Sequence, residues 1–256
     1  MTVDRFSMDG KVAVVTGGGR GIGRAIAEGF AEAGADVVPT SRTREDVDAV
    51  CEAVRERGSE ALTVTTDVTD ESDVRSLVDE TVAELGGVDV VVNNAGVNPD
   101  GALGPPEAVD PEGYEFTLDV NLGGAFRCAS TAAEALHENG GGCVVNVASV
   151  GGLVGLPRQH PYVASKHGLV GMTKSMALDW APDVRVNAVA PGYVKTELTE
   201  DVYGNEDIRQ SILDRTPLDR FAEPAELAGP AVFLASDAAS YVTGECLAAD
   251  GGWTSR

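Results

Sequence analysis

A serine, a tyrosine and a lysine near the middle of the chain have the spacing of a proton-transfer site. Tyr162 and Lys166 are four residues apart, so a helix would place them on one face, and Ser149 stands thirteen residues before the tyrosine. A free tyrosine has a pKa near ~10, and a neighbouring cation lowers that pKa because it favours the phenolate. The trio predicts acid–base chemistry on an alcohol or carbonyl oxygen, whereas the Y-x-x-x-K spacing alone also arises by chance.

A glycine-rich loop near the N-terminus has the context of a phosphate-binding loop. The apolar run 11–15 predicts a buried parallel strand, and residues 24–34 predict an amphipathic helix that ends in a glycine. The loop between them has the glycine spacing G-x-x-x-G-x-G, at Gly17, Gly21 and Gly23. Glycines let the backbone approach a pyrophosphate, and a helix N-terminus favours an anion. Strand, loop and helix together predict dinucleotide binding, although such a loop by itself would indicate only a turn.

With further motifs in the same order, the sequence resembles the classical short-chain dehydrogenases/reductases over nearly all of its length. These motifs are TGGGRGIG at 16–23, NNAG at 93–96, Asn121 within DVNL, the Ser149–Tyr162–Lys166 trio, PGYVKT at 191–196 and DGG at 250–252. The resemblance implies a nicotinamide cofactor, hydride transfer at a CH–OH carbon and the catalytic residues Asn121, Ser149, Tyr162 and Lys166. Ser149 would orient the reacting oxygen, and Asn121 would interrupt its helix and hold a relay water, unless it is only a satisfied core amide.

The same resemblance assigns the residues that would hold the cofactor. Thr196 would bind the nicotinamide carboxamide, Lys166 would contact the ribose beside it, and Asp67 would lie at the adenine, unless it only caps the segment that follows it. The full expected set is Gly17, Arg20, Gly21, Ile22, Gly23, Ser41, Arg42, Asp67, Val68, Asn94, Ala95, Gly96, Tyr162, Lys166, Pro191, Gly192, Val194 and Thr196. No residue is expected to bind a metal.

The end of the second predicted strand indicates which dinucleotide is preferred. An acidic residue there would hold a ribose 2′-hydroxyl and repel a 2′-phosphate, but this chain has Ser41 followed by Arg42. Arg20 is expected in the same region, and a guanidinium pairs well with phosphate oxygens. We therefore expect NADP(H) to be preferred, with NAD(H) as the alternative if both arginines are only solvated surface charges.

Alternating strand and helix patterns predict an α/β fold, a Rossmann-type doubly wound parallel sheet of about seven strands in a single domain, 1–256. Residues from about 8 to 100 would form mainly the cofactor-binding half, and about 101–256 the catalytic and substrate-binding half. Strands should begin near Val12, Asp36, Ala61, Val88, Cys143, Val184 and Glu245, with helices at about 114–137 and 161–180. Pro39 is expected near a strand end, because it cannot donate a ladder hydrogen bond.

Acidic residues outnumber basic ones by 41 to 19, and the formal net charge is -22. This charge argues against nucleic acids and anionic membranes as partners. Repulsion among these negative charges also destabilises the folded state. Salt at about 1 M removes most of this repulsion, because the screening length falls to roughly 3 Å. Only four of the basic residues are lysines, and a low lysine content also fits a protein that works at high salt. We hypothesise a halophilic protein in a salty cytoplasm, with an ordinary acidic surface as the alternative.

The remaining composition predicts a cytoplasmic protein with reduced thiols. The N-terminus lacks the apolar segment of a signal peptide, and no run of about 18 apolar residues could span a membrane. Four scattered cysteines and three histidines lack the spacing of a disulfide framework or a metal site. By the family resemblance, the helices at 114–137 and 161–180 would pair across subunits in a homotetramer.

The substrate is the least determined feature. Residues 97–106 and 155–160 would line its pocket, where Asn98, Arg158, Gln159 and His160 suit a polyhydroxylated molecule. Residues 197–221, hereafter the cover segment, resemble the mobile lid of the family. A small-molecule sugar or polyol is the first expectation. A 3-oxoacyl thioester is the second, although an acidic carrier protein would be repelled in low salt. A non-catalytic dinucleotide sensor is the third.

Overall fold

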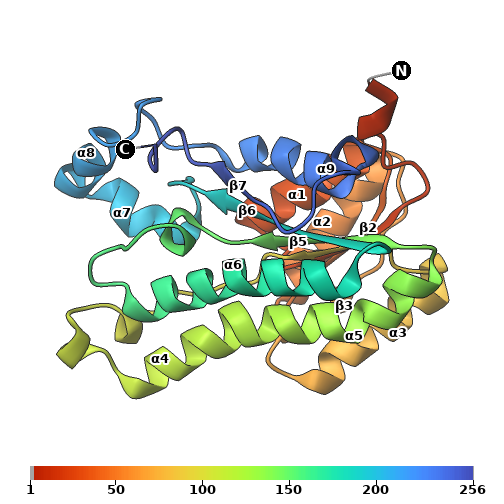
Figure 1. The fold of residues 1–256 in the computed structure, drawn as a ribbon, viewed down its shortest axis with the longest axis horizontal. Coiled ribbons are helices and arrows are strands. Elements are labelled where there is room, and N and C mark those ends of the chain that lie inside the picture. The colour runs from red at the N-terminus through yellow and green to blue at the C-terminus, as the bar shows by residue number, and fades with distance from the viewer. Residues whose placement is uncertain (1–2, 256) are drawn as a thin grey trace.

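A single sheet of seven parallel strands runs through the molecule (Figure 1), whose residues 3–255 are described by a computed structural model. The order β3-β2-β1-β4-β5-β6-β7 reverses direction between β1 and β4. The strands are β1 (Val12–Thr16), β2 (Asp36–Ser41), β3 (Val64–Thr65), β4 (Val90–Asn93), β5 (Gly142–Val147), β6 (Val184–Pro191) and β7 (Cys246–Ala249). The predicted doubly wound, Rossmann-type sheet is confirmed. In such a sheet the ligand site lies at the carboxyl ends of the strands, near the reversal.

Helices cover both faces of the sheet (Figure 1). On one face lie α1 (Gly21–Glu32), α2 (Arg44–Glu56) and α9 (Ala228–Ala235), and on the other lie α3 (Glu71–Leu85), α5 (Ala125–Glu138) and α6 (His160–Trp180). Val14 and Val15 of β1 enter opposite core clusters, as the two-residue period of a strand requires. Because both faces are buried, the strands read as continuous apolar runs rather than as alternating ones.

The helix expected over 114–137 is divided into two. It consists of α4 (Pro111–Leu118), a π-helical turn at Asp119–Gly124 and α5. The cover segment contains α7 (Glu200–Gly204) and α8 (Glu206–Leu213). Short 3-10 turns occur at Val3–Phe6, Asp100–Ala102, Pro106–Ala108, Val150–Gly152, Glu197–Thr199, Pro224–Leu227 and Asp237–Ala239. No helix in the described range is long and apolar enough to cross a membrane.

The prediction for Pro39 is wrong. It lies inside β2, opposite Val15 of β1, rather than near the strand end. Residues two positions away on either side, Val37 and Ser41, hydrogen bond toward the β3 side of the sheet, so Pro39 faces that side as well. There the neighbouring chain leaves the sheet between an isolated bridge at Ala61 and the start of β3. Proline has no N–H to donate, and at this position the pairing between β2 and the neighbouring chain is interrupted. The same break in the pairing explains why β3 begins later than expected.

Candidate active site

A cleft of about 620 Å³ opens at the carboxyl ends of the strands and collects most of the predicted site residues. The predicted residues that line it are Gly17, Arg20, Gly21, Ile22, Ser41, Arg42, Asp67, Val68, Asn94, Ala95, Gly96, Ser149, Tyr162, Lys166, Pro191, Gly192, Val194 and Thr196. Gly23 and Asn121 lie behind its wall. A Cβ atom on Gly23 would stand 2.2 Å from the Gly17 carbonyl oxygen, so this glycine lets α1 pack directly on the loop.

The glycine loop forms an open cradle at the N-terminus of α1. Gly17 and Gly21 have φ angles of 61° and 56°, in the left-handed region that favours glycine. Asn94 fixes the loop to the segment after β4, because its side-chain nitrogen donates to the carbonyl oxygens of Thr16 and Gly17, both at 3.0 Å. No side chain caps the first turn of α1 at Arg20. The N–H groups of that turn are therefore available to an anion, and the cradle fits the phosphates of a dinucleotide.

The proton-transfer trio comes together on the opposite side of the cleft. Tyr162 and Lys166 lie in the first turns of α6, with the lysine Nζ 5.7 Å from the centre of the tyrosine ring. Lys166 donates a hydrogen bond of 2.8 Å to the carbonyl oxygen of Val147 in β5. Ser149 follows that strand, and its hydroxyl accepts from the Gly151 N–H at 3.0 Å. The prediction that Tyr162 and Lys166 share one face of a helix is confirmed. The carbonyl that binds Lys166 lies at the end of β5 and Ser149 follows that strand, so β5 positions both.

The electrostatics of the trio differ from the sequence-based expectation. Burial raises the pKa of Tyr162, and a hydrogen bond with the Ser149 side chain opposes this shift only in part. Burial also lowers the pKa of Lys166 to about 8, and its ammonium is bonded to a backbone carbonyl. The expected lowering of the tyrosine pKa by Lys166 is therefore wrong for this arrangement. Because the phenol keeps its proton at neutral pH, the trio in this state is set to act as an acid.

Asn121 fastens the site from behind. Its side-chain nitrogen donates to the Val97 carbonyl oxygen at 3.0 Å and to the Ser165 hydroxyl at 3.1 Å, and its oxygen accepts from the Val97 N–H at 2.7 Å. Ser165 in turn donates to the carbonyl oxygen of Tyr162 at 2.7 Å. The expected interruption of the helix is confirmed, since Asn121 lies in the π-helical turn. The π-helical turn directs the Asn121 amide toward both the segment after β4 and the start of α6.

The far end of the cleft is formed by the C-terminal end of β2 and the start of α2. Arg42 is exposed there, and Asp46 faces the same region from the first turn of α2. A Cβ atom on Gly19 would stand 2.8 Å from the Asp46 Cβ and 3.0 Å from the Ser41 hydroxyl oxygen, so both side chains border one point of the loop. Within the described residues, neither Arg42 nor Asp46 forms an ion pair. This end of the cleft therefore carries one unpaired charge of each sign.

The side chain that caps the following helix, α3, belongs to Asp70 rather than to Asp67. Asp67 lines the cleft, and it accepts hydrogen bonds from the Thr69 N–H at 2.9 Å and hydroxyl at 2.7 Å. These bonds lower the pKa of its carboxyl group, and the nearby charge of Arg42 acts in the same direction. Asp67 is therefore held ionised and fixed in position.

Arg20 lines the cleft, but its guanidinium already has a partner. Its guanidinium is paired with Glu197, the first residue of the cover segment, and both side chains are about two-thirds exposed, at 68% and 64%. Sequence reasoning missed Glu197 and Asp46. Both could have been found by their positions, because Glu197 directly follows Thr196 and Asp46 lies in the first turn of the helix that follows Arg42.

Of the four candidate substrate contacts, Asn98 alone is among the residues that line the cleft. Its side-chain nitrogen donates to Gln159 at 3.1 Å, which joins the two segments expected to border the substrate. His160 instead faces a separate shallow hollow on the outside of α6, together with His167. Arg158 adopts a φ of 64° and bonds through its carbonyl oxygen to Gly104 at 2.9 Å. Among the described residues, no group of three or more histidine, cysteine or acidic side chains could hold a metal ion.

Comparisons with known proteins agree with this geometry. A family profile described as enoyl-(acyl carrier protein) reductase matches residues 17–254. The 2-dehydro-3-deoxy-D-gluconate 5-dehydrogenase of Dickeya dadantii is 38% identical over 265 residues, which cover 100% of both chains. The 3-oxoacyl-[acyl-carrier-protein] reductase of Staphylococcus aureus is 36% identical over 94% of this chain and 97% of that one. A solved gluconate 5-dehydrogenase from Burkholderia cenocepacia, in complex with NADP and tartrate, is 37% identical, covers 100% of both chains and has a TM-score of 0.95.

Proposed function

The chain belongs to the short-chain dehydrogenase/reductase family, and from that premise we propose that it exchanges hydride between NADP(H) and a sugar, polyol or sugar acid. Membership itself makes it an NAD(P)-dependent oxidoreductase acting on CH–OH groups. One observation carries the proposal, namely that the glycine cradle and the Ser149–Tyr162–Lys166 trio line the same cleft. The substrate carbon would react between them, at the secondary alcohol or the corresponding ketone.

The residues of the trio divide the work of proton transfer. A bound nicotinamide supplies or accepts the hydride, and the protein provides position and proton transfer. Tyr162 gives its proton to the carbonyl oxygen in reduction and receives one from the hydroxyl in oxidation. Ser149 hydrogen bonds to the same oxygen and fixes its orientation. Lys166 places a positive charge beside the phenol, and Asn121 holds the start of α6 in register with the segment after β4.

The preference for a polyhydroxylated substrate rests on the polar wall of the cleft. Asn98 lines the cleft at the substrate end and is held by a hydrogen bond to Gln159, so hydroxyl groups of a ligand would find an amide there. Relatives named for gluconate derivatives match the chain over its whole length, which supports the same class. The binding segments 97–106 and 155–160 would therefore select among sugars, polyols and sugar acids.

A 3-oxoacyl thioester is the second candidate, because the cover segment exposes apolar side chains. Leu198, Ile208 and Leu218 are 54%, 46% and 63% exposed, and Leu198 lines the cleft. Such residues would suit an acyl chain, and the Staphylococcus aureus relative is named for this reaction. The net charge of -22 opposes an acidic carrier protein at low salt, so a coenzyme A thioester fits better than a carrier-bound one.

The NADP(H) preference rests on Arg42 more than on Arg20. Arg42 is exposed at the end of β2 and forms no ion pair with any residue in the range 3–255, so it can meet a 2′-phosphate, whereas Arg20 is already paired with Glu197. Asp46 faces the same end of the cleft and works against that phosphate. The enzyme would therefore prefer NADP(H) and still accept NAD(H).

A substrate and cofactor screen tests the proposed function. The purified protein is assayed with aldoses, polyols, sugar acids and acetoacetyl-coenzyme A, each with NADP(H) and NAD(H). Turnover of a polyhydroxylated substrate with NADP(H) is the expected result. Turnover confined to the thioester would replace it with the second candidate. Cofactor binding without turnover of any alcohol or ketone would favour the dinucleotide sensor.

The surface charge supports a salty cytoplasm as the working environment. At about 1 M salt the screening length is roughly 3 Å, which removes most of the self-repulsion of a chain with charge -22. Dialysis into dilute buffer should therefore reduce both activity and the helical circular dichroism signal, and added salt should restore them. Full activity in dilute buffer would contradict the halophilic assignment.

Two helices would carry the contacts between subunits of a homotetramer. Phe126 on α5 and Leu178 on α6 are 53% and 83% exposed, on the two helices expected to pair across subunits. Burying these apolar side chains would stabilise the assembly. Light scattering at working salt concentration gives the subunit number directly.

A further inference from the structure

The glycine loop and the cover segment are joined by an ion pair across the mouth of the cleft. Arg20, which immediately precedes α1, donates from Nη1 to the Oε2 atom of Glu197. The two segments also pack closely, since a Cβ atom on Gly21 would stand 3.4 Å from the Thr196 Cγ2 atom. All four residues line the cleft. The first turn of the cover segment is thus fastened to the loop that would cradle the cofactor phosphates.

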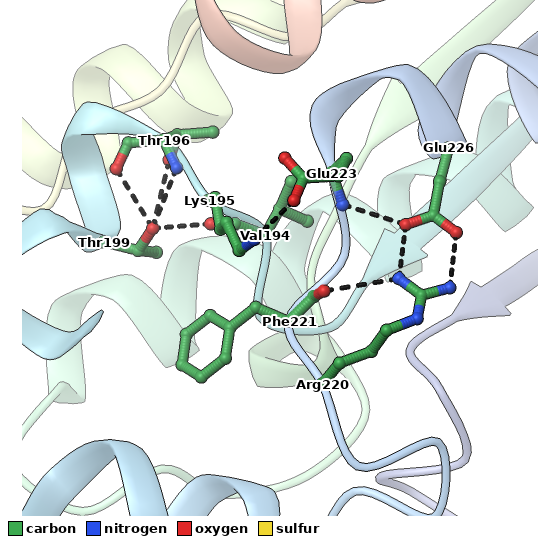
Figure 2. Close-up of polar contacts among 8 residues, drawn as sticks. All are labelled: Val194, Lys195, Thr196, Thr199, Arg220, Phe221, Glu223 and Glu226. Carbon is green, nitrogen blue, oxygen red and sulfur yellow. Dashed lines mark hydrogen bonds and ion pairs between the residues drawn. The ribbon is translucent and has the colours of Figure 1, made fainter. Parts of the chain in front are cut away.

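At its N-terminal end the cover segment is anchored through Thr199 (Figure 2). The Thr199 hydroxyl donates to the carbonyl oxygen of Val194 at 2.5 Å and accepts from the Thr196 N–H at 3.1 Å. These bonds make a compact turn at the exit from β6. Glu197 lies inside that turn, so its carboxylate is presented toward the glycine loop by a fixed piece of backbone rather than by a free chain.

At its C-terminal end the cover segment is anchored by Arg220, which binds both carboxylate oxygens of Glu226 at 2.6 Å (Figure 2). The guanidinium lowers the pKa of Glu226 to about 2, so this carboxylate is ionised at neutral pH. Lys195 and Glu223, which flank the segment on either side, form a second ion pair that holds the chain before it to the chain after it. Both ends are therefore fixed to the frame, and the contact with Arg20 lies between the anchored turn and the cofactor loop.

A carboxylate and a phosphate compete for the same guanidinium, because each accepts its forked N–H donors. We propose that Glu197 sets the affinity for the cofactor, because it holds Arg20 in the free enzyme and yields it to a cofactor phosphate on binding. The phosphate is either the 2′-phosphate of NADP(H) or the pyrophosphate common to both dinucleotides. Release of Glu197 also removes the contact between the first turn of the cover segment and the glycine loop, while the Thr199 bonds of that turn remain. This inference rests on the proposed dinucleotide cleft and adds a residue that sets its affinity.

The test compares Glu197→Gln with wild type in cofactor binding. The pair is exposed, and such pairs contribute little, so we expect the dissociation constant for NADP+ to fall about two- to fivefold. A gain for NADP+ alone identifies the 2′-phosphate, and an equal gain for NAD+ identifies the pyrophosphate. At about 1 M salt the gain should shrink toward none, because the screening length falls to roughly 3 Å.

Two controls separate the proposed exchange from a general change of charge. Glu206→Gln removes the same charge from the cover segment and breaks an exposed pair with Arg209 of 2.5 Å, but Glu206 does not line the cleft. It should leave both dissociation constants unchanged. In an Arg20→Met background, Glu197→Gln should have no further effect. An effect that persists in that background, or that Glu206→Gln reproduces, would overturn the proposal.

Limited proteolysis provides a readout that does not depend on affinity. Without cofactor, Glu197→Gln should be cleaved within the cover segment about two- to fivefold faster than wild type, in proportion to the lost pair. With saturating NADP+, the two proteins should be cleaved at the same rate. Equal cleavage in the absence of cofactor would overturn the proposal. If wild type binds neither dinucleotide, the proposed function itself fails, and that result is distinct from equal binding by wild type and variant.

Discussion

The two ends of the cleft are built from different kinds of interaction. At the catalytic end, Lys166 is 4% exposed and donates to a backbone carbonyl, and Asn121 is 1% exposed with its amide bonded to main chain and to Ser165. At the far end, Arg20 and Arg42 are long, exposed side chains, and one of them is held only by another exposed charge. The proposed proton-transfer residues are therefore held by the sheet and by α6, whereas the residues proposed to set the cofactor preference are in contact with water.

This difference predicts how each end responds to substitution. Buried polar groups lose a great deal when one partner is removed, because the other partner is left without a hydrogen bond in a region of low dielectric constant. Exposed charges interact through water and are screened by salt, so their removal changes affinity by small factors. Substitutions at the catalytic end should act on turnover or stability by large amounts. Those at the far end should change the choice between dinucleotides while turnover persists.

Tyr162→Phe should have the largest effect. It removes the hydroxyl that we propose as the proton donor and acceptor and leaves the ring in place, so kcat should fall roughly 10²- to 10⁴-fold, the usual contribution of general acid–base catalysis. Cofactor affinity should change little, because the glycine cradle is untouched. Steady-state kinetics and a parallel binding titration measure the two quantities. Retained turnover would show that another group carries the proton and would remove the trio from the mechanism.

Lys166→Met should make the protein more stable while it removes activity. The folded pKa of Lys166 is about 8 against an ordinary value of 10.5. Below about pH 8 both folded and unfolded chains carry the proton, and the folded state bears the full penalty of the buried ammonium, at most about 3 kcal/mol. Between pH 8 and 10.5 the unfolded chain holds more protons than the folded one, so the wild type gains stability as pH rises.

Denaturant unfolding of both proteins at several pH values measures this effect. The variant should exceed wild type in free energy of unfolding at pH 7, and the difference should shrink steadily through the window between the two pKa values. The variant also loses the hydrogen bond to Val147, which reduces its gain in free energy of unfolding by the same amount at every pH. A difference that is independent of pH would mean that the ammonium is solvated in the folded protein, and the assigned burial of the site would then be wrong.

The catalytic end was largely predictable from the sequence, because its geometry follows from local structure. The i, i+4 spacing of Tyr162 and Lys166 fixes their common face once α6 forms, and residues that follow parallel strands meet at one edge of the sheet. The spacing of residues in the sequence does not show which group the tip of a flexible side chain contacts. Lys166 bonds to Val147, nineteen residues earlier in the chain, and this contact exists only after β5 and α6 pack together. The wrong expectation for the tyrosine pKa follows from that.

The far end was predictable only in part, because its charges come from segments that are distant in sequence. Arg20 and Glu197 are 177 positions apart, and no local pattern links them. The position of Pro39 had a similar origin, since it depends on where the neighbouring strand breaks rather than on the residue itself. Sequence patterns identify which residues reach the cleft. Which exposed charges pair with one another can be known only from the folded structure.

Arg42→Asp and Asp46→Asn should shift cofactor preference in opposite directions, and they are the smallest effects that distinguish the two ends. The first replaces the proposed partner of the 2′-phosphate by a repelling carboxylate, so the ratio of kcat/KM for NADP(H) over NAD(H) should fall roughly 10- to 100-fold. The second removes only an unpaired carboxylate, so the ratio should rise about two- to fivefold and the rise should fade at high salt. Both should retain turnover with at least one dinucleotide. If both ratios stay at the wild-type value, the 2′-phosphate lies elsewhere in the cleft, and Arg20 becomes its candidate partner once Glu197 is displaced.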